Sequence, residues 1–136
     1  MEKKNIQLSI VTPERNVVSS RVSIVMAPGA EGEFGVLINH TPFLTSLKTG
    51  IIRYTEDGGK EKHVFVSGGF AEVLPDKVTV LAEIAEKEED IDIKRAEEAR
   101  ARAEKRMAEA KDPDERERAR EALWRANQRL DCCQAE

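Results

Sequence analysis

Four arginines in the last third of the chain have the type and spacing to bind an anion with several oxygen atoms. Arg95 and Arg102 are seven residues apart, and Arg125 and Arg129 are four apart, so each pair shares one face of a helix. Folding two such helices together would gather four guanidinium groups, which repel one another unless an anion lies among them. The planar fork of arginine binds phosphate oxygens in pairs, so the pattern indicates a polyphosphate. A solvated charged surface is the alternative interpretation, and the spacing leaves both open.

The arginines lie in a segment whose apolar residues recur at intervals of three and four, which predicts amphipathic helices. The two stripes are Ile93, Ala96, Ala99 or Arg100, Ala103, Met107 and Ala110, and then Ala119, Leu123, Ala126 and Leu130. Between them, Asp112 suits a helix N-cap and Pro113 suits the first helical position. We therefore predict two antiparallel helices at about 90–110 and 113–131.

The predicted helical stripes consist mostly of alanine. Alanine has the highest helix propensity but little side-chain area, so its burial contributes much less than that of leucine at ~25 cal/mol per Å². The helices should persist individually while their packing stays weak. We therefore expect two arrangements of the helices that differ by only a few kcal/mol.

The first part of the chain alternates apolar and polar residues, as in Ile6, Leu8 and Ile10, which predicts strands with one buried face. Turn-forming residues recur at Thr12-Pro13-Glu14, Pro28-Gly29, Glu56-Asp57-Gly58-Gly59, Ser67-Gly68-Gly69 and Pro75-Asp76. Short strands with turns about every 8–12 residues indicate a sandwich or barrel. The predicted fold is α+β, with an N-terminal antiparallel β-sandwich over residues 1–85 and a C-terminal antiparallel two-helix hairpin over residues 86–136.

Composition excludes several classes of protein. The chain of 136 residues has a formal net charge of −4, which argues against a nucleic-acid-binding protein. Its apolar runs are far shorter than the ~18 residues of a membrane span, and the N-terminus lacks the apolar segment of a signal peptide. The adjacent Cys132 and Cys133 are expected to be reduced thiols, because neighbouring cysteines rarely bridge each other.

The residues indicate neither a catalytic centre nor a metal site. His40 ends an apolar stretch, but no nucleophile or second histidine stands at a suitable spacing from it. No glycine cluster matches a phosphate-cradling loop. A small hydrolase that uses His40 with a carboxylate is a third interpretation.

Three stretches together resemble the epsilon subunits of bacterial F-type ATP synthases, in register from about residue 5 to residue 131. They are Gly32-x-x-Gly35-Val36-Leu37 followed by His40-x-Pro42-x-Leu44-x-x-Leu47-x-x-Gly50, then Ser67-Gly68-Gly69-Phe70-Ala71-Glu72-Val73, and finally Val78-Thr79-Val80-Leu81-Ala82. The opening Ile10-Val11-Thr12-Pro13-Glu14 also fits this family. In the second part, Ile91-Asp92-Ile93-Lys94-Arg95-Ala96 resembles the nucleotide motif Ile/Leu-Asp-x-x-Arg-Ala of the same family.

The resemblance implies a non-catalytic rotor subunit without a required cofactor. One end of the sandwich, at Glu31, Gly32 and Glu33, would rest on the ring of c subunits, and a face near His40 would pack on the gamma subunit. ATP would be a regulatory ligand of the hairpin. The residues implied at the ATP site are Glu86, Asp92, Arg95, Arg102, Arg125 and Arg129.

The implied mechanism has two states of the hairpin. With ATP bound, the helices stay folded beside the sandwich. Without it, they extend into the catalytic head, where Arg116, Arg118 and Arg120 would meet acidic segments of the alpha and beta subunits and block ATP hydrolysis. The protein would associate peripherally with the cytoplasmic side of the bacterial plasma membrane, through the complex only. The alternative from another class is a free-standing nucleotide sensor or coiled-coil adaptor.

Overall fold

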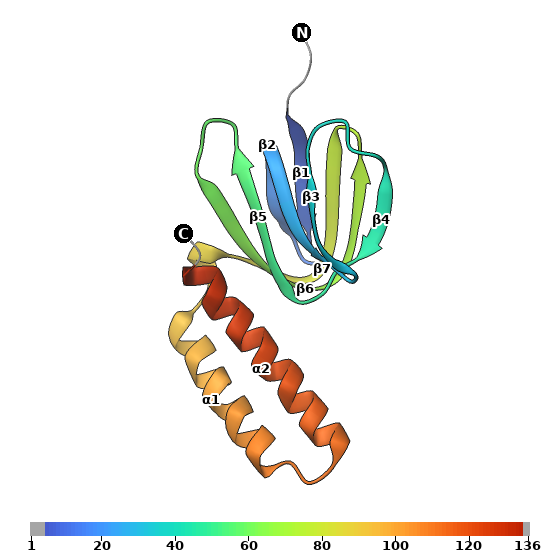
Figure 1. Cartoon of the computed structure of the whole chain (residues 1–136). Coiled ribbons are helices and arrows are strands. Elements are labelled where there is room, and N and C mark those ends of the chain that lie inside the picture. The colour runs from blue at the N-terminus through green and yellow to red at the C-terminus, as the bar shows by residue number, and fades with distance from the viewer. Residues whose placement is uncertain (1–4, 135–136) are drawn as a thin grey trace.

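Seven strands precede two helices in the computed structural model, which describes residues 5–134 (Figure 1). The strands are β1 (Ile6–Val11), β2 (Asn16–Gly29), β3 (Gly32–Val36), β4 (Phe43–Ser46), β5 (Gly50–Glu56), β6 (Glu61–Leu74) and β7 (Lys77–Lys87). A 3-10 turn, η1 (Glu88–Asp90), then leads into α1 (Ile93–Glu109) and α2 (Pro113–Gln134). Residues 1–4 and 135–136 of the two predicted domain ranges lie outside the described residues.

The strands form the expected sandwich because two long strands, β2 and β6, each pair with strands of both layers. The order of pairing is β1-β7-β6-β5-β2-β3, and β4 pairs with β6. The first half of β2 pairs antiparallel with β1, whereas its second half pairs with β5 and β3, after a register shift between Val22 and Ile24. The pairing of β1 with β7 is parallel and closes the arrangement. The predicted fold class, a β-sandwich followed by a two-helix hairpin, is confirmed.

The apolar residues that alternate along the strands make up the core between the layers. Ile6, Leu8 and Ile10 of β1 are fully buried, and Val64 and Val66 of β6 pack in the same cluster. The turn predicted at Asp57-Gly58 joins β5 to β6, with Gly58 at a φ of 68°. Positive φ values are free of steric cost only for glycine, which explains the residue at this hairpin.

The prediction of a turn at Ser67-Gly68-Gly69 was wrong, because β6 runs through these residues. Gly68 and Gly69 have φ values of 72° and 110°, and they lie between the part of β6 that pairs with β5 and the part that pairs with β4. A Cβ added to Gly69 would lie 2.0 Å from the carbonyl oxygen of Leu81 on the neighbouring strand. The two glycines therefore redirect one long strand from one layer to the other.

The two helices pack on each other through small side chains. Ala96 and Ala103 of α1 and Ala119 and Ala126 of α2 are buried, as the alanine stripes predict. Ile93 was expected on the stripe but is 50% exposed, since Ile91, two residues earlier, occupies the buried position beside the sandwich. The side chain of Asp112 accepts a hydrogen bond from the Glu115 amide at 2.9 Å, which confirms the predicted cap of α2.

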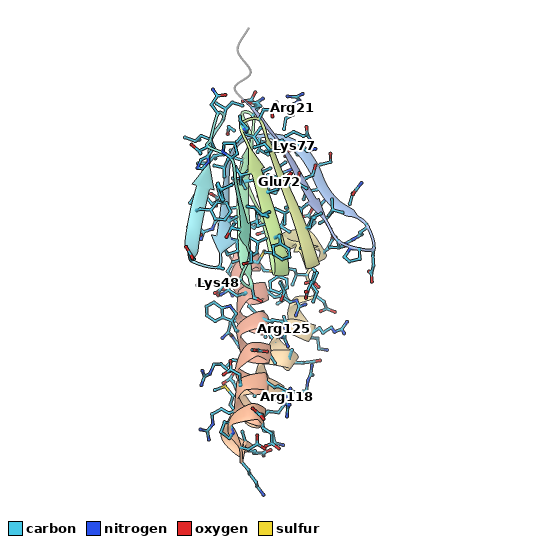
Figure 2. The ribbon with its side chains drawn as sticks, turned by 90° about the vertical axis from the view of Figure 1, so that its right-hand side faces the viewer. Arg21, Lys48, Glu72, Lys77, Arg118 and Arg125 are labelled. Carbon is cyan, nitrogen blue, oxygen red and sulfur yellow. The ribbon has the colours of Figure 1, made fainter. Side chains whose placement is uncertain are left out.

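The hairpin is attached at one end of the sandwich, and the C-terminal part of α2 provides most of the contact (Figures 1 and 2). Phe65 of β6 is the centre of this contact, where it packs with Ile91 and Cys132. Trp124 of α2 donates from its indole nitrogen to the carbonyl oxygen of Thr49 at 3.0 Å. Neither helix has a stretch long and apolar enough to span a membrane.

Candidate functional site

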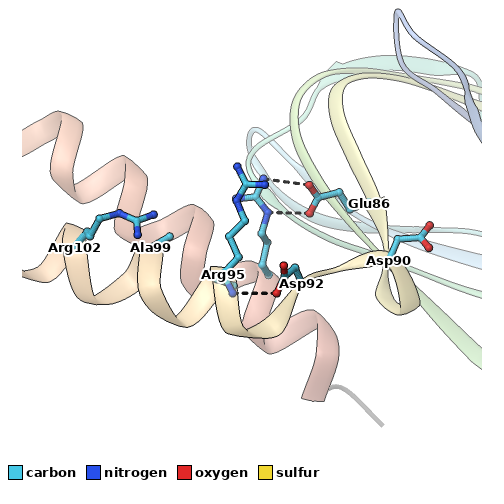
Figure 3. Close-up of a pocket in the computed structure, with 8 residues that line it drawn as sticks. Glu86, Asp90, Asp92, Arg95, Ala99 and Arg102 are labelled. Carbon is cyan, nitrogen blue, oxygen red and sulfur yellow. Dashed lines mark hydrogen bonds and ion pairs between the residues drawn. The ribbon is translucent and has the colours of Figure 1, made fainter.

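A pocket of about 360 Å³ lies where the hairpin meets the sandwich (Figure 3). It is lined by Glu86 of β7, Asp90 of η1, Asp92, Arg95, Ala96, Ala99 and Arg102 of α1 and its cap, and Arg129 of α2. Five of the six residues that the family resemblance implied for a nucleotide site therefore meet around one pocket. They come from three separate elements and from the cap of α1.

The start of α1 places the first of these arginines. Asp92 is the N-cap of α1, and its carboxylate accepts a hydrogen bond from the backbone amide of Arg95 at 3.1 Å. This bond fixes the direction in which the first turn leaves the linker. Arg102 lies two turns farther along α1 and farther from the sandwich (Figure 3). The spacing of seven residues thus puts both guanidinium groups along one wall of the pocket.

Arg129 joins the pocket from the other helix. Its Nε donates to Glu86 Oε1 at 2.9 Å and its Nη2 donates to Glu86 Oε2 at 3.4 Å, so the pair is held at two points. The guanidinium also lies over the ring of Phe65, 4.5 Å from its centroid, as a cation–π contact. Arg129 therefore both lines the pocket and fastens α2 to the sandwich.

The pocket lining has three carboxylates and three guanidinium groups, so its formal charges balance, but not every guanidinium group is paired. Within residues 5–134, the guanidinium groups of Arg95 and Arg102 form no ion pair with a carboxylate. The donors of Arg95 and Arg102 are therefore free to bind the oxygens of an anionic ligand, with the carboxylates of Asp90 and Asp92 in the same lining. The wall also includes the methyl groups of Ala96 and Ala99, which leave room beside the arginines.

Asp90 lines the pocket although sequence reasoning did not select it. It lies two residues before Asp92, in the turn η1, near the end of the pocket next to the strands (Figure 3). Its only signal in the sequence was its nearness to the nucleotide motif. Whether a linker carboxylate faces a pocket depends on the path of the linker, which periodicity does not define.

Arg125 does not lie with the other three arginines. It lines a second pocket on the hairpin together with Thr49, Glu117, Arg120, Glu121 and Trp124. The expectation that the folded hairpin brings four guanidinium groups together is therefore corrected to three. Arg125 is one turn before Arg129 on the same face of α2, but its side chain lies beside Thr49 and Trp124, whereas that of Arg129 donates to Glu86.

The residues expected at partner surfaces lie on the outside of the molecule. Glu31, Gly32 and Glu33 form the exposed tip between β2 and β3, where Glu33 pairs with Arg53 at 3.3 Å. His40 lies in the loop before β4, with its ring 5.2 Å from that of Phe43 and its Nδ1 2.7 Å from the Thr41 carbonyl oxygen.

The three basic residues expected to meet the catalytic head are exposed in the N-terminal part of α2. They are Arg116, Arg118 and Arg120. Arg118 lies near the end of the hairpin away from the sandwich, whereas Arg125 lies closer to the strands (Figure 2). Arg120 forms a surface ion pair with Glu117 at 3.4 Å, which is worth little in water.

Burial dominates the electrostatics of the two cysteines at the end of α2. Both are free thiols, and burial against the sandwich raises the pKa of Cys132 to about 12. Burial and then the nearby Glu88 carboxylate also raise the pKa of Cys133. Among residues 5–134, no three His, Cys, Asp or Glu side chains group in a way that would hold a metal ion.

Two family models cover almost the whole chain. The beta-sandwich domain of the ATP synthase delta/epsilon chain matches residues 5–88, and the long alpha-helix domain of the same chain matches residues 89–134. The mitochondrial ATP synthase of Euglena gracilis, solved with OSCP, F1 and c-ring, contains a chain that superposes with a TM-score of 0.82 at 25% identity. That match covers 94% of this chain and 81% of the other.

Curated relatives named ATP synthase epsilon chain are more similar in sequence. The protein of Desulforapulum autotrophicum is 58% identical over 93% of this chain and 94% of its own length. That of Nitratidesulfovibrio vulgaris is 55% identical over 94% of this chain and 95% of its own. The resemblance found in the sequence motifs is thereby confirmed, and the chain belongs to the delta/epsilon chain family of ATP synthase subunits.

Proposed function

We propose that this chain is a non-catalytic rotor subunit of a bacterial F-type ATP synthase, which couples gamma to the c-ring and restrains ATP hydrolysis through its hairpin. The regulatory part of this proposal is supported by the pocket at the base of the hairpin. There Arg95 and Arg102 have no ion-pair partner among the described residues, and Arg129 ties α2 to the sandwich.

An exposed apolar face supports the role in coupling. Leu44, Phe70 and Leu81 are 69%, 56% and 56% exposed on neighbouring strands of one layer. Phe70 and Leu81 are direct cross-strand partners, so they lie side by side. Large apolar side chains that gather on a sheet face mark a surface for another protein. We assign this face to gamma and the tip at Glu31–Glu33 to the c-ring.

The proposed ligand of the pocket is ATP, bound as a signal. Its phosphate oxygens suit the free forks of Arg95 and Arg102, which have donors spaced for paired oxygens. The same pocket is bounded by β7, α1 and α2, so a ligand in it contacts every part whose relative position defines the folded state. ATP favours that state only to the extent that it binds it more tightly than the extended one.

The weak packing of the hairpin supports its release. Its helices touch through the buried Ala96, Ala103, Ala119 and Ala126, which bury little area. Most of its contact with the sandwich comes from the second half of α2 and the turn η1. In the released state, the exposed Arg116, Arg118 and Arg120 are placed to meet acidic segments of the catalytic head and hinder rotation.

The proposed location follows from the complex. The subunit is held peripherally at the cytoplasmic side of the bacterial plasma membrane by the c-ring and gamma. Affinity purification of the tagged chain from its own cells, with identification of the recovered proteins, tests this proposal. Recovery of gamma and c subunits is expected. Recovery of neither, from a chain that still binds ATP, would instead indicate the free-standing nucleotide sensor.

Isothermal titration with ATP tests the regulatory ligand. We expect heat of binding for the wild type and a loss of at least about tenfold in affinity for Arg95→Ala, since one charge-assisted contact is worth about 1.5–3 kcal/mol. Arg100→Ala is the matched control, because Arg100 is on the same helix, pairs with Glu104 and lies outside the pocket. No heat with the wild type would reject ATP as the ligand.

A further inference from the structure

The only two cysteines of the chain are neighbours at the end of α2, and the docked position of the hairpin covers both. Cys132 is fully buried, in one apolar cluster with Phe65 of β6 and Ile91 of the linker. Cys133 is partly buried at the edge of that cluster, and its Sγ donates to the Glu88 carbonyl oxygen at 3.9 Å. Both thiols therefore belong to the contact by which the end of α2 meets the sandwich (Figure 1).

The helix keeps the two sulfur atoms apart. Consecutive side chains of an α-helix point in directions about 100° apart, so residues i and i+1 do not face each other. A disulfide needs Cβ atoms about 3.5–4.5 Å apart and side chains directed at one another. A bond between Cys132 and Cys133 therefore requires the last turn of α2 to unwind, and at least one sulfur then leaves its contact.

The docked state also protects the thiols chemically. Burial raises the pKa of Cys132 to about 12, and burial and then the Glu88 carboxylate raise the pKa of Cys133. Because the thiolate is the form that attacks a disulfide, the docked pair reacts slowly. Release of the hairpin removes this burial and exposes both thiols at the end of a helix, where the backbone unwinds readily.

We propose that Cys132 and Cys133 form a thiol oxidation site that is covered in the docked hairpin and accessible in the released one. The oxidant is a low-molecular-weight disulfide, and the product is an internal disulfide between the two neighbouring residues. This bond removes Cys132 from its place against Phe65, so the oxidised chain does not dock again. The site deepens the proposed regulation and rests on the hairpin being able to leave the sandwich.

The reaction consists of two thiol–disulfide exchanges. In the first, the thiolate of the less buried Cys133 attacks one sulfur of the oxidant, forms a mixed disulfide and releases half of the oxidant as a thiolate. In the second, the Cys132 thiolate attacks the Cys133 sulfur and expels the other half as a thiolate. The pair loses two electrons and two protons, and the oxidant becomes two thiol molecules.

Docking and oxidation oppose each other by the same factor. Oxidation shifts the hairpin toward release, and whatever favours docking makes the pair harder to oxidise. In this two-electron couple, a tenfold change in the equilibrium constant corresponds to about 30 mV in reduction potential. A disulfide between neighbouring residues is strained, and strained disulfides are readily reduced. An excess of thiol therefore returns the hairpin to the docked state.

Both events can be measured on the full chain. Its single tryptophan, Trp124, is bonded to Thr49 in the docked state, so its emission reports undocking. Mass spectrometry identifies the product of oxidation. The internal disulfide lowers the mass by two hydrogen atoms, whereas a mixed disulfide adds half of the oxidant.

The experiment treats the chain with glutathione disulfide at about pH 8, near the ordinary pKa of a thiol. Arg129→Ala, which loses the bond to Glu86, should form the internal disulfide roughly tenfold faster than the wild type. Arg100→Ala, which pairs with Glu104 on the outside of α1, is the matched control and should react as the wild type does. ATP should slow the reaction of the wild type.

The effect on docking is measured on the oxidised wild type. Its Trp124 emission should be that of the undocked hairpin, and an excess of dithiothreitol should restore the docked emission. A variant that carries both Cys132→Ala and Cys133→Ser is the control for the oxidant itself. Its emission should not change when glutathione disulfide is added.

Three results would overturn the oxidation site. They are docked emission from a chain whose mass shows the internal disulfide, a mixed disulfide or linked dimer as the sole product, and equal rates for wild type and an Arg129→Ala variant that undocks at lower urea. The proposed function is tested separately on the variant without cysteines. If ATP still promotes docking there, the release of the hairpin stands. A hairpin that never undocks, with or without ATP, would reject both proposals.

Discussion

Arg129 and Glu86 are 43 positions apart in the sequence, yet two hydrogen bonds of 2.9 and 3.4 Å join their side chains. This pair links the last turns of α2 to the final strand of the sandwich, beside the ring of Phe65. Both side chains are only partly exposed, at 24% and 33%, so water screens the contact incompletely.

Replacing Arg129 by alanine should therefore loosen the hairpin without unfolding the sandwich. We expect docking to weaken by about 1–3 kcal/mol, from loss of the charged hydrogen bonds and of the cation–π contact. Arg129→Lys should be intermediate, because lysine keeps the charge but not the fork. Urea titration followed by Trp124 emission measures docking, and Arg100→Ala is the control. Equal midpoints for Arg129→Ala and wild type would show that the pair contributes little.

The placement of Arg125 predicts a ranking of arginine variants. Arg102 faces the pocket with no ion-pair partner among residues 5–134, whereas Arg125 lines the separate pocket at Trp124. Arg102→Ala should reduce ATP affinity roughly tenfold, and Arg125→Ala less than about threefold. Calorimetric titration of both variants at one ionic strength provides the comparison. The reverse ranking would contradict the placement of the ligand in the pocket at Arg95 and Arg102.

Thiol reactivity should report the docked state. Burial raises the pKa of Cys132 to about 12, far above the ~8.5 of a free thiol, so little of it is thiolate at pH 8. In a Cys133→Ser background, alkylation of Cys132 should be slow, faster when Arg129→Ala is added, and slower with ATP. The reaction is followed by mass spectrometry, with the urea-unfolded chain as reference. A Cys132 that reacts as fast as in the unfolded chain would contradict its burial.

Acid should weaken the end of the β5–β6 hairpin. Hydrogen bonds from Lys62 and then Ser20 hold the pKa of Glu56 below its ordinary value. The carboxylate of Glu56 therefore takes up a proton at a higher pH in the unfolded chain than in the folded chain. The resulting stability is present at neutral pH and is lost as the pH falls through the lowered folded pKa.

Glu56→Gln should accordingly lower the melting temperature at pH 6. The difference in melting temperature between this variant and the wild type should become smaller below about pH 4. Thermal unfolding followed by circular dichroism between pH 7 and pH 3 measures this. Glu14→Gln, an exposed change in the turn after β1, is the control that should behave as wild type. A difference that stays constant over the whole range would show that the charge of Glu56 is not its cause.

The local elements could be predicted because each depends on neighbours in sequence. Alternation in Ile6, Leu8 and Ile10 and the interval of seven between Ala96 and Ala103 report which side of an element is buried. The cap at Asp112 also needs only the following turn. The turn expected at Gly68-Gly69 was wrong because positive φ in glycine serves both a turn and a redirected strand.

The sequence by itself determined that the chain forms a sandwich and a hairpin whose helices meet through alanines. It also determined which residues are candidates for an anion site. The tertiary structure decided which of those residues meet. Arg129 donates to Glu86 while Arg125, one turn earlier on the same face of α2, lines another pocket. The direction of each long side chain depends on the residues packed around it. Asp90 also lines the pocket, because contacts between distant segments depend on packing, which local periodicity does not encode.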